Sequence, residues 1–327
     1  MNSTTTTTTD NITSIPSPPS PPTMDQQQPL RIAILLNSYR SPFLPAIRAS
    51  YERAITAVSP DAQLSFFFPA YSDDNDANND PKRPQHHHHH HQQYHHYQQL
   101  GGEGTLPSDP SAYDLIVLGG SNVDPRARHH AWIQKVHRFV RDCVSQSQSP
   151  PGPSEAAGTA AAGAGAGRKT PKMCGICWGH QTIALLFGGE VVEAERPELG
   201  VTEAKLTPAG RRFFPSRGLE GTLRLQQHHR REVGKAPQGF TELVAGNQGF
   251  LSHDNTILTL QGHPEKDAQC AKLRIHDATR WYGIDVDDHA ARAAILRSME
   301  LPHHGAEVWE RILRWAREKH PSHEVHL

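Results

Sequence analysis

Short, uninterrupted apolar segments alternate along this chain with longer segments whose apolar positions repeat at helical spacing. Strands without polar alternation are typical of a parallel sheet covered on both faces, and amphipathic helices supply that cover. We therefore predict an α/β fold with helices on both faces of a mostly parallel sheet. The expected strands are 31–36, 63–68, 114–118 and 172–176, and the expected helices are 44–58, 131–144, 179–187 and 306–319.

The pattern changes after residue 200, where strand-like segments follow one another closely. They are the sequences VTEAKLT at 201–207, TLRLQQ at 222–227, FTELVA at 240–245 and TILTLQ at 256–261. Closely spaced strands without intervening helices are typical of antiparallel pairing. We expect a small antiparallel β extension of the sheet, or a small β subdomain.

Three segments lack aliphatic periodicity and cannot bury enough apolar surface to offset the entropy of ordering them. We predict a disordered tail over 1–29 and a single domain over 30–327, with low-complexity insertions at 72–110 and 145–170. The first insertion contains the tract His86 to His91. Imidazoles bind transition metals weakly in such a tract, but an unstructured repeat fixes no coordination geometry, so we expect a solvated segment.

Composition narrows the classes of partner and compartment. The 33 Lys and Arg residues nearly balance the 34 Asp and Glu residues, so no overall field attracts a nucleic acid or an anionic membrane. No apolar run approaches the ~20 residues that span a bilayer. The four cysteines are too few and too unevenly spaced for a secreted disulfide framework. We expect a cytoplasmic protein with free thiols.

The sequence MCGICWGHQ at 173–181 places a cysteine where an expected strand turns into an expected helix. Gly175 and Gly179 flank Cys177 in the pattern G-x-C-x-G, and a sharp strand-to-helix turn needs such small neighbours. The start of a helix also favours the thiolate, which is the reactive form of cysteine. Cys177 is therefore the predicted nucleophile for attack on a carbonyl carbon.

An attack of this kind needs hydrogen-bond donors for the oxyanion that develops. The backbone N–H of Trp178, directly after the nucleophile, is the first candidate. Gly119 and Gly120 follow the expected strand 114–118 and would lie at the same carboxyl edge of the sheet, so a Gly120 amide is the second. The alternative is that these two glycines only permit a turn.

A second informative sequence is TLQGHPE at 259–265, where an apolar strand ends in histidine, proline and glutamate. His263 is placed to take the thiol proton and return it to the departing amine, and Glu265 to orient the imidazole. An isolated H-P-E is a weak signal in a chain with 23 histidines. Combined with the cysteine turn, it predicts a Cys-His-Glu triad.

The sequences GICWGHQ at 175–181 and LQGHPE at 260–265 resemble the two signatures of class I glutamine amidotransferase domains. The resemblance extends over about residues 31–282 and is closest to stand-alone fungal and plant members, including γ-glutamyl peptidase-like proteins. It implies a three-layer, flavodoxin-like fold and the triad Cys177, His263 and Glu265.

The same resemblance implies substrate-binding roles for Gly119, Gln181 and His229. The sequence QHHRREV at 227–233, followed by PQGF at 237–240, resembles a further family motif, H-x-D-x-V…P-x-G-F. That motif commonly has an acidic residue two positions after its histidine, whereas Arg231 stands two positions after His229 here. How the α-amino group of a substrate is bound therefore stays open.

The predicted reaction is hydrolysis of a γ-glutamyl amide, glutamine to glutamate and ammonia, through a γ-glutamyl thioester. The mechanism needs no metal and no organic cofactor. The predicted partners are the small-molecule substrate and, as a further candidate, a separate synthase subunit. Three alternatives are a γ-glutamyl peptidase acting on glutathione-like conjugates, a non-catalytic binding protein of the same fold, and a redox protein using the C-x-x-C pair Cys174 and Cys177.

Overall fold

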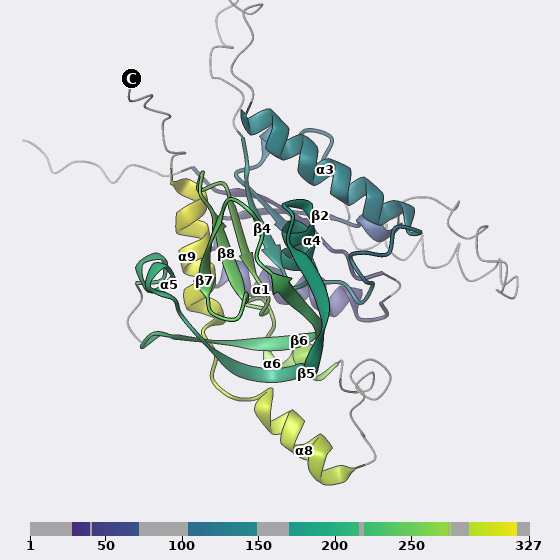
Figure 1. Ribbon diagram of the computed structural model, residues 1–327, viewed down its shortest axis with the longest axis vertical. Helices are drawn as coiled ribbons and strands as arrows, with labels where there is room; N and C mark the ends of the chain where they lie inside the picture. Colours follow the sequence, from purple (N-terminus) through teal and green to yellow (C-terminus); the bar gives the residue numbers. More distant parts are fainter. Residues whose placement is uncertain are drawn as a thin grey trace, which may run out of the picture.

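A seven-stranded sheet forms the centre of the computed structural model, which describes residues 28–39, 41–71, 104–148, 170–215, 219–273, 275 and 288–318 (Figure 1). The strand order is β2-β1-β3-β4-β9-β8-β7. The first four neighbouring pairs are parallel, and the last two are antiparallel. The strands are β1 Arg31–Leu35, β2 Gln63–Phe67, β3 Leu115–Leu118, β4 Lys172–Ile176, β7 Phe240–Val244, β8 Gly249–Ser252 and β9 Ile257–Leu260.

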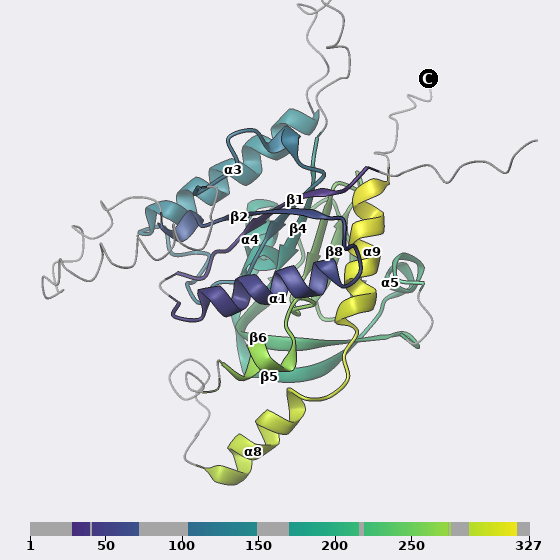
Figure 2. The ribbon, with the colours of Figure 1, turned by 180° about the vertical axis from the view of Figure 1, so that it is seen from behind.

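Helices cover the two faces of this sheet. Helices α1 (Leu44–Thr56) and α9 (Gly305–Arg317) pack on one face, and Figure 2 shows both in front of the strands. Helices α3 (Ala131–Gln148) and α4 (Trp178–Leu186) pack on the other face. Alternate residues of each strand enter the two cores, because successive side chains of a strand point to opposite faces. The result is a three-layer α/β fold.

A long antiparallel ribbon of two strands forms a separate sheet. It consists of β5 (Glu190–Lys205) and β6 (Thr222–Lys235), with a register shift between Glu193 and Glu198 where Pro197 interrupts the ladder. Figure 1 shows this ribbon between the main sheet and α8. The remaining helical segments are α5 Pro208–Phe213, α6 Ala268–Lys272, α8 His289–Ser298 and the 3₁₀ turns η1 Pro69–Tyr71 and η3 Pro110–Ala112.

The predicted fold class is confirmed, and three details differ. Segment 256–261, grouped with the antiparallel strands, contains β9, which pairs antiparallel with β8 but also in parallel with β4. The strands expected at 201–207 and 222–227 belong to the longer β5 and β6, which form their own sheet. Helix α3 continues to Gln148, so it occupies the start of the insertion predicted at 145–170. Sequence periodicity could not show which segments continue a helix or join a second sheet.

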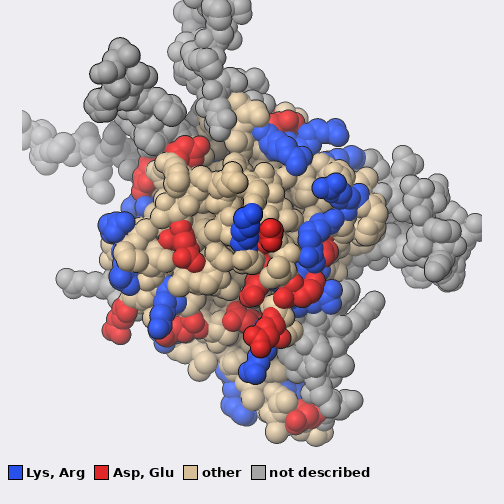
Figure 3. Space-filling model, in the orientation of Figure 1, with Lys and Arg blue, Asp and Glu red and all other residues tan. Residues whose placement is uncertain are grey.

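Several predicted segments fall outside the described residues. They are residues 1–27 of the expected tail, 72–103 of the first insertion, which include His86 to His91, and 149–169 of the second. Within the described ranges no helix is both long and apolar enough to cross a membrane. Positive and negative side chains are interspersed over the face in Figure 3, in line with the near balance of charges in the sequence.

Candidate active site

The turn between β4 and α4 holds Cys177 in an unusual backbone conformation. Its φ of 53° and ψ of −102° lie outside the common regions for a side chain of L configuration, and its N–H donates to the Leu260 carbonyl at 2.9 Å. The two flanking glycines are required sterically. A Cβ at Gly179 would lie 2.1 Å from the Leu118 carbonyl oxygen, and one at Gly175 would lie 2.7 Å from the Gly179 oxygen. The sharp strand-to-helix turn that the sequence predicts around Cys177 is therefore present.

The H-P-E segment follows β9 and brings its histidine and glutamate together. His263 Nδ1 lies 2.7 Å from Glu265 Oε1, and both side chains are almost fully buried. The backbone N–H of His263 donates to the Gln226 carbonyl of β6 at 2.9 Å, and the Ser50 hydroxyl of α1 donates to the Glu265 carbonyl. Both neighbours fix the segment that presents the imidazole.

Cys177 and His263 meet at the carboxyl edge of the sheet, against the loop after β3. A Cβ at Gly120 would lie 3.0 Å from His263 Cε1 and 3.8 Å from Cys177 Cβ. Burial alone would raise the pKa of Cys177, but the positive charge of the neighbouring His263 lowers that pKa to about 7. Against the effects of burial and of Lys266, the charges of Glu265 and Cys177 raise the pKa of His263. The arrangement favours a thiolate beside an imidazolium.

A cavity with about 540 Å³ of empty space, including its opening to solvent, lies over these groups. Its wall comes from the loop after β1, the start of α1, the loop after β3, strand β6 and the segment after β9. The lining residues are Ser38, Phe43, Ile47, Gly120, Ser121, Asn122, Cys177, His228, His263, Glu265, Lys266 and Cys270.

The three residues predicted to bind substrate do not line this cavity. Gln181 Nε2 instead donates to the Arg231 carbonyl at 2.6 Å and to Gln261 Oε1 at 3.0 Å. His229 Nε2 lies 3.1 Å from Glu198 Oε2 across the ribbon. The carbonyl of Gly119 accepts a hydrogen bond from Asn37 Nδ2 at 3.2 Å, which fixes the loop that carries Gly120.

The cavity also contains residues that the sequence analysis did not select. His228 lines it rather than His229, because neighbouring residues of a strand face opposite sides. Ser38 belongs to the polar pair Asn37–Ser38, which is separated from β1 by Leu36, and Lys266 directly follows the H-P-E sequence. Their positions in the sequence could have predicted this, because polar residues that follow parallel strands gather at one edge of the sheet.

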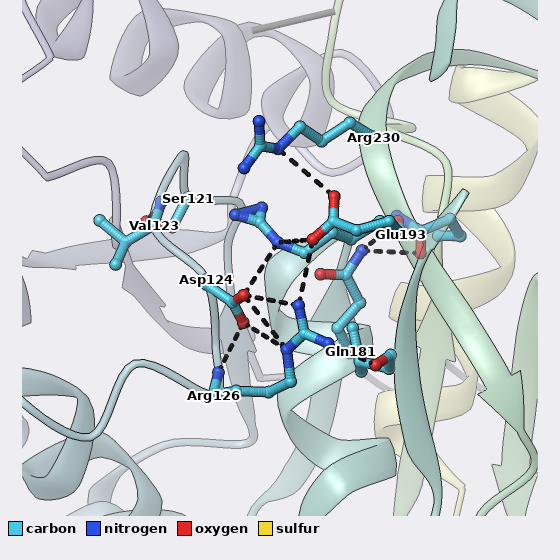
Figure 4. A network of polar contacts seen from close by, with 10 residues as sticks. Ser121, Val123, Asp124, Arg126, Gln181, Glu193 and Arg230 are labelled. Atoms are coloured by element: carbon cyan, nitrogen blue, oxygen red, sulfur yellow. Dashed lines mark hydrogen bonds and ion pairs between the residues drawn. The ribbon is translucent and has the colours of Figure 1, made fainter. Parts of the chain in front are cut away.

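A network of ion pairs joins the loop after β3 to the ribbon (Figure 4). Asp124 accepts three hydrogen bonds from the guanidinium of Arg126, which also contacts Glu193 Oε1 at 3.1 Å. The buried Arg231 places Nε 3.5 Å from Asp124 Oδ2 and 3.7 Å from Glu193 Oε1. Arg230 Nε lies 3.6 Å from Glu193 Oε2. Arg231, at the position where an acidic residue is usual, is thus paired with two carboxylates.

The other cysteines differ from Cys177 in environment. Cys174 is completely buried within β4, and burial raises its pKa far above the ordinary value. Burial also raises the pKa of Cys270 and takes that of Cys143 to about 12. All four thiols are free, and the described part of the chain contains no group of His, Cys, Asp and Glu side chains that could hold a metal ion.

Comparison with known proteins relates this chain to glutamine amidotransferases. Residues 147–277 match the family model of class-I glutamine amidotransferases. The chain is 26% identical over 300 residues to the glutamine amidotransferase-like protein chyE of Penicillium rubens, covering 90% of this chain and 100% of chyE. It is 30% identical over 215 residues to the glutamine amidotransferase-like protein chry6 of Gibberella zeae, covering 65% of this chain and 76% of chry6. The chain belongs to the class I glutamine amidotransferase family.

The fold of this amidotransferase-family protein is similar to that of a solved glutamine amidotransferase structure. A crystal structure of a glutamine amidotransferase from Thermotoga maritima superposes with a TM-score of 0.53 at 15% sequence identity. The superposition covers 88% of this chain and 99% of the other. The fold that the two proteins share is the flavodoxin-like α/β fold.

Proposed function

We propose that the protein is a cysteine hydrolase that cleaves γ-glutamyl amides, with glutamine as substrate and glutamate and ammonia as products. The observation that supports this most strongly is the meeting of Cys177 with the buried His263–Glu265 pair in one cavity, where the pKa of the thiol is lowered to about 7. A thiolate near neutral pH, a proton carrier and its orienting carboxylate are the groups that amide cleavage by cysteine requires.

The reaction begins with attack of the Cys177 thiolate on the γ-carbonyl carbon of the substrate. The carbonyl oxygen becomes an oxyanion, for which the backbone N–H groups of Gly120 and Trp178 are the proposed donors. Trp178 is the first residue of α4, where backbone N–H groups have no carbonyl partner within the helix. The oxyanion then collapses, the C–N bond breaks, and His263 gives its proton to the departing amine.

The second half of the reaction hydrolyses the γ-glutamyl thioester. His263, now neutral, takes a proton from water, and the resulting hydroxide attacks the thioester carbonyl. The C–S bond breaks, glutamate leaves, and Cys177 returns to its starting state as the imidazolium is restored. Glu265 keeps the ring oriented through both half-reactions, because its hydrogen bond fixes Nδ1 as the proton-bearing nitrogen.

A γ-glutamyl peptidase is the second candidate, and one feature of the cavity favours it. Phe43 and Ile47, from the start of α1, form an apolar part of the wall. Ammonia has no apolar surface to pack there, whereas the amine of a γ-glutamyl conjugate has. If ammonia is the product instead, a separate synthase subunit is the proposed recipient, which would have to dock over the mouth of the same cavity.

Purified protein incubated with glutamine and, separately, with glutathione tests both candidates. We expect glutamate release from at least one of them in the wild type and none in Cys177→Ser. Acid quenching followed by mass spectrometry should find a γ-glutamyl adduct on the peptide that contains Cys177. Ammonia release from glutamine alone favours the amidotransferase-type reaction, and release of cysteinylglycine favours the peptidase.

Equal signals from the wild type and Cys177→Ser would refute hydrolysis and favour a non-catalytic binding protein. The C-x-x-C alternative has its own diagnostic result. Loss of activity in Cys174→Ala with full activity in Cys177→Ala would overturn the assignment of Cys177 as nucleophile, whereas a redox role for the pair would require both cysteines. The complete burial of Cys174 and its raised pKa lead us to expect the reverse.

A further inference from the structure

Arg126 connects the loop after β3 to the ribbon through a single side chain (Figure 4). Its guanidinium donates to both carboxylate oxygens of Asp124, in the same loop, at 2.7–3.1 Å. The same guanidinium donates to the Val191 carbonyl at 2.8 Å and to Glu193 Oε1 at 3.1 Å, both in β5. Because a guanidinium carries several donors in one rigid plane, it can hold the loop and the strand in a fixed relation.

The ribbon, in turn, is attached to the two segments that carry the nucleophile and the proton carrier. Gln181 of α4, the helix that starts directly after the nucleophile, donates to the Arg231 carbonyl of β6 at 2.6 Å. The backbone N–H of His263 donates to the Gln226 carbonyl of the same strand at 2.9 Å. Glu193, which the loop contacts, pairs with Arg231 across the ribbon. The loop is therefore anchored next to the point where the ribbon meets α4.

The loop after β3 carries a group that the proposed reaction needs in a fixed place. The N–H of Gly120 is a proposed donor to the oxyanion, and such donors act when they are held in advance about 2.7–3.1 Å from the oxygen. On one side of Gly120, Asn37 Nδ2 donates to the Gly119 carbonyl at 3.2 Å. On the other side, Asp124 is held by Arg126. The donor thus lies between two anchors, of which Arg126 provides the second.

The charges of this second anchor are maintained at neutral pH. Burial would raise the pKa of Asp124, but hydrogen bonds from Arg126 lower it, and the bonds to Asp124 raise the pKa of Arg126. The two side chains are 40% and 30% exposed, for Arg126 and Asp124 respectively. Ion pairs this exposed contribute little to the stability of a fold. Arg126 is therefore better suited to fixing the position of the loop than to stabilising the protein.

We propose that Arg126 is a positioning residue of the active site, which holds the Gly120 N–H in place for the oxyanion by anchoring the loop after β3 to the ribbon. The inference rests on the proposed γ-glutamyl hydrolysis. The ribbon then acts as a common support, since it also holds α4 and the imidazole of His263. The oxyanion donor, the thiolate and the proton carrier keep their relative positions through both half-reactions.

Replacing Arg126 by methionine removes the anchor and retains an unbranched apolar side chain. With glutamine, or with glutathione if that is the substrate, we expect kcat to fall about 5- to 50-fold and KM to stay within about 2-fold. The reason is that the oxyanion is absent from the bound substrate and develops only as the reaction proceeds. Arg126→Lys keeps the charge without the planar set of donors, so its kcat should be intermediate.

The matched control is Lys235→Met. It removes the exposed ion pair between Lys235 Nζ and Glu190 Oε1, 3.8 Å apart, which lies within the same ribbon. We expect kcat and KM within about 2-fold of the wild type, because neither side chain belongs to the anchor. An unchanged kcat in Arg126→Met, or a loss of the same size in Lys235→Met, would overturn the proposal.

Alkylation of Cys177 by iodoacetamide distinguishes a displaced oxyanion donor from a damaged triad. This reaction forms no oxyanion, so its rate and its pH midpoint should be the same in Arg126→Met and the wild type, within about 2-fold. Alkylation that slows in parallel with kcat would show that Arg126 acts on the triad as a whole and would overturn the proposal. A change confined to KM would also overturn it.

Hydrogen–deuterium exchange tests the anchor without turnover. In a Cys177→Ser background, Arg126→Met should speed exchange about 5-fold or more in peptides covering residues 119–128 and leave peptides from β4 unchanged. Lys235→Met should leave both unchanged. Unchanged exchange in the loop of Arg126→Met would refute this inference even if glutamine is hydrolysed. Faster exchange in a protein that hydrolyses neither substrate would support the anchor and refute the proposed function alone.

Discussion

His263 Nδ1 and Glu265 Oε1 are 2.7 Å apart, and the two side chains are 3% and 2% exposed. Because both side chains are buried, the Glu265 carboxylate affects the charge of the His263 ring as well as its orientation. Its charge raises the pKa of His263, and the imidazole in turn lowers the pKa of Glu265. The pair is thus prepared to hold a proton close to the thiolate.

Replacing Glu265 by glutamine keeps the size of the side chain and removes its charge. Without the carboxylate the imidazolium is less stable, so we expect kcat/KM for γ-glutamyl substrates to fall by about 10²–10⁴. Affinity for L-glutamate in a Cys177→Ser background should stay within about 2-fold, since the carboxylate is used by His263 rather than by the ligand. Full activity in Glu265→Gln would remove this residue from the triad.

The thiolate itself can be observed by alkylation with iodoacetamide across the neutral pH range. In the wild type, the rate at Cys177 should rise with pH through a midpoint near 7, because the thiolate forms above its pKa of about 7. His263→Asn removes the positive charge that lowers this pKa, so burial should move the midpoint above the ordinary value for cysteine.

The remaining cysteines provide the background for that measurement. The pKa values of Cys143, Cys174 and Cys270 are all raised, so these residues should stay protonated and unlabelled near neutral pH. Cys177→Ser should therefore abolish rapid labelling. An unchanged midpoint in His263→Asn would show that the two residues are not coupled.

Gly179 gives a prediction about stability. It lies within α4, where alanine is normally preferred to glycine by about 1 kcal/mol. A Cβ at this position would lie 2.1 Å from the Leu118 carbonyl oxygen, so α4 or β3 must move to accept it. We expect Gly179→Ala to lower the free energy of unfolding by about 1–3 kcal/mol, as measured by urea denaturation.

Gly120→Ala is the matched comparison. Its Cβ would meet the Cε1 atom of His263 at 3.0 Å, which is a side-chain contact at the reaction centre rather than a backbone contact in the core. Activity should fall, with the free energy of unfolding within about 0.5 kcal/mol of the wild type. A Gly179→Ala protein that is more stable than the wild type would show that the turn tolerates side chains.

The substitution Arg231→Asp tests whether the protein accepts the acidic residue that the family commonly has at this position. Arg231→Asp would place a third carboxylate beside Asp124 and Glu193, where the guanidinium now lies at 3.5 and 3.7 Å. We expect a loss of about 1–3 kcal/mol in the free energy of unfolding and no improvement in KM for glutamine. Both partners are partly exposed, so the loss should lie at the lower end of this range at high salt.

Two further variants serve as controls for the stability of Arg231→Asp. Arg231→Met removes the cation without adding a carboxylate and should be less destabilising than Arg231→Asp. Combining Arg231→Asp with Glu193→Gln should restore part of the lost stability, because one repulsion is removed. A lower KM for glutamine in folded Arg231→Asp would instead assign this position to the substrate's amino group.

The chain's local patterns were sufficient to predict the layers of the fold and the residues that meet at its carboxyl edge. The segment 172–176 coincides with β4, and the glycines around Cys177 were expected for the steric reason that the structure gives. These features depend on neighbours in sequence: apolar runs, helical spacing and a tight turn. They were therefore accessible without coordinates.

The wall of the cavity depends on long-range contacts and was predicted less well. The choice of His228 over His229 is set by which face of β6 meets the nucleophile, and a sequence motif does not specify that register. Gln181 was assigned to substrate, yet its amide is bonded to the Arg231 backbone. Lys266 was overlooked because a lysine next to a glutamate is usually a solvated residue.

The bridge between Gln226 and His263 links the ribbon to the imidazole by a backbone hydrogen bond. Any slip in the pairing of β6 would therefore displace the proton carrier as well as the cavity wall. Substitutions near the start of α1, at Phe43 or Ile47, change the wall from a different element of the fold. Divergence towards new substrates within this architecture should accordingly begin at α1, while the ribbon retains its length and alignment.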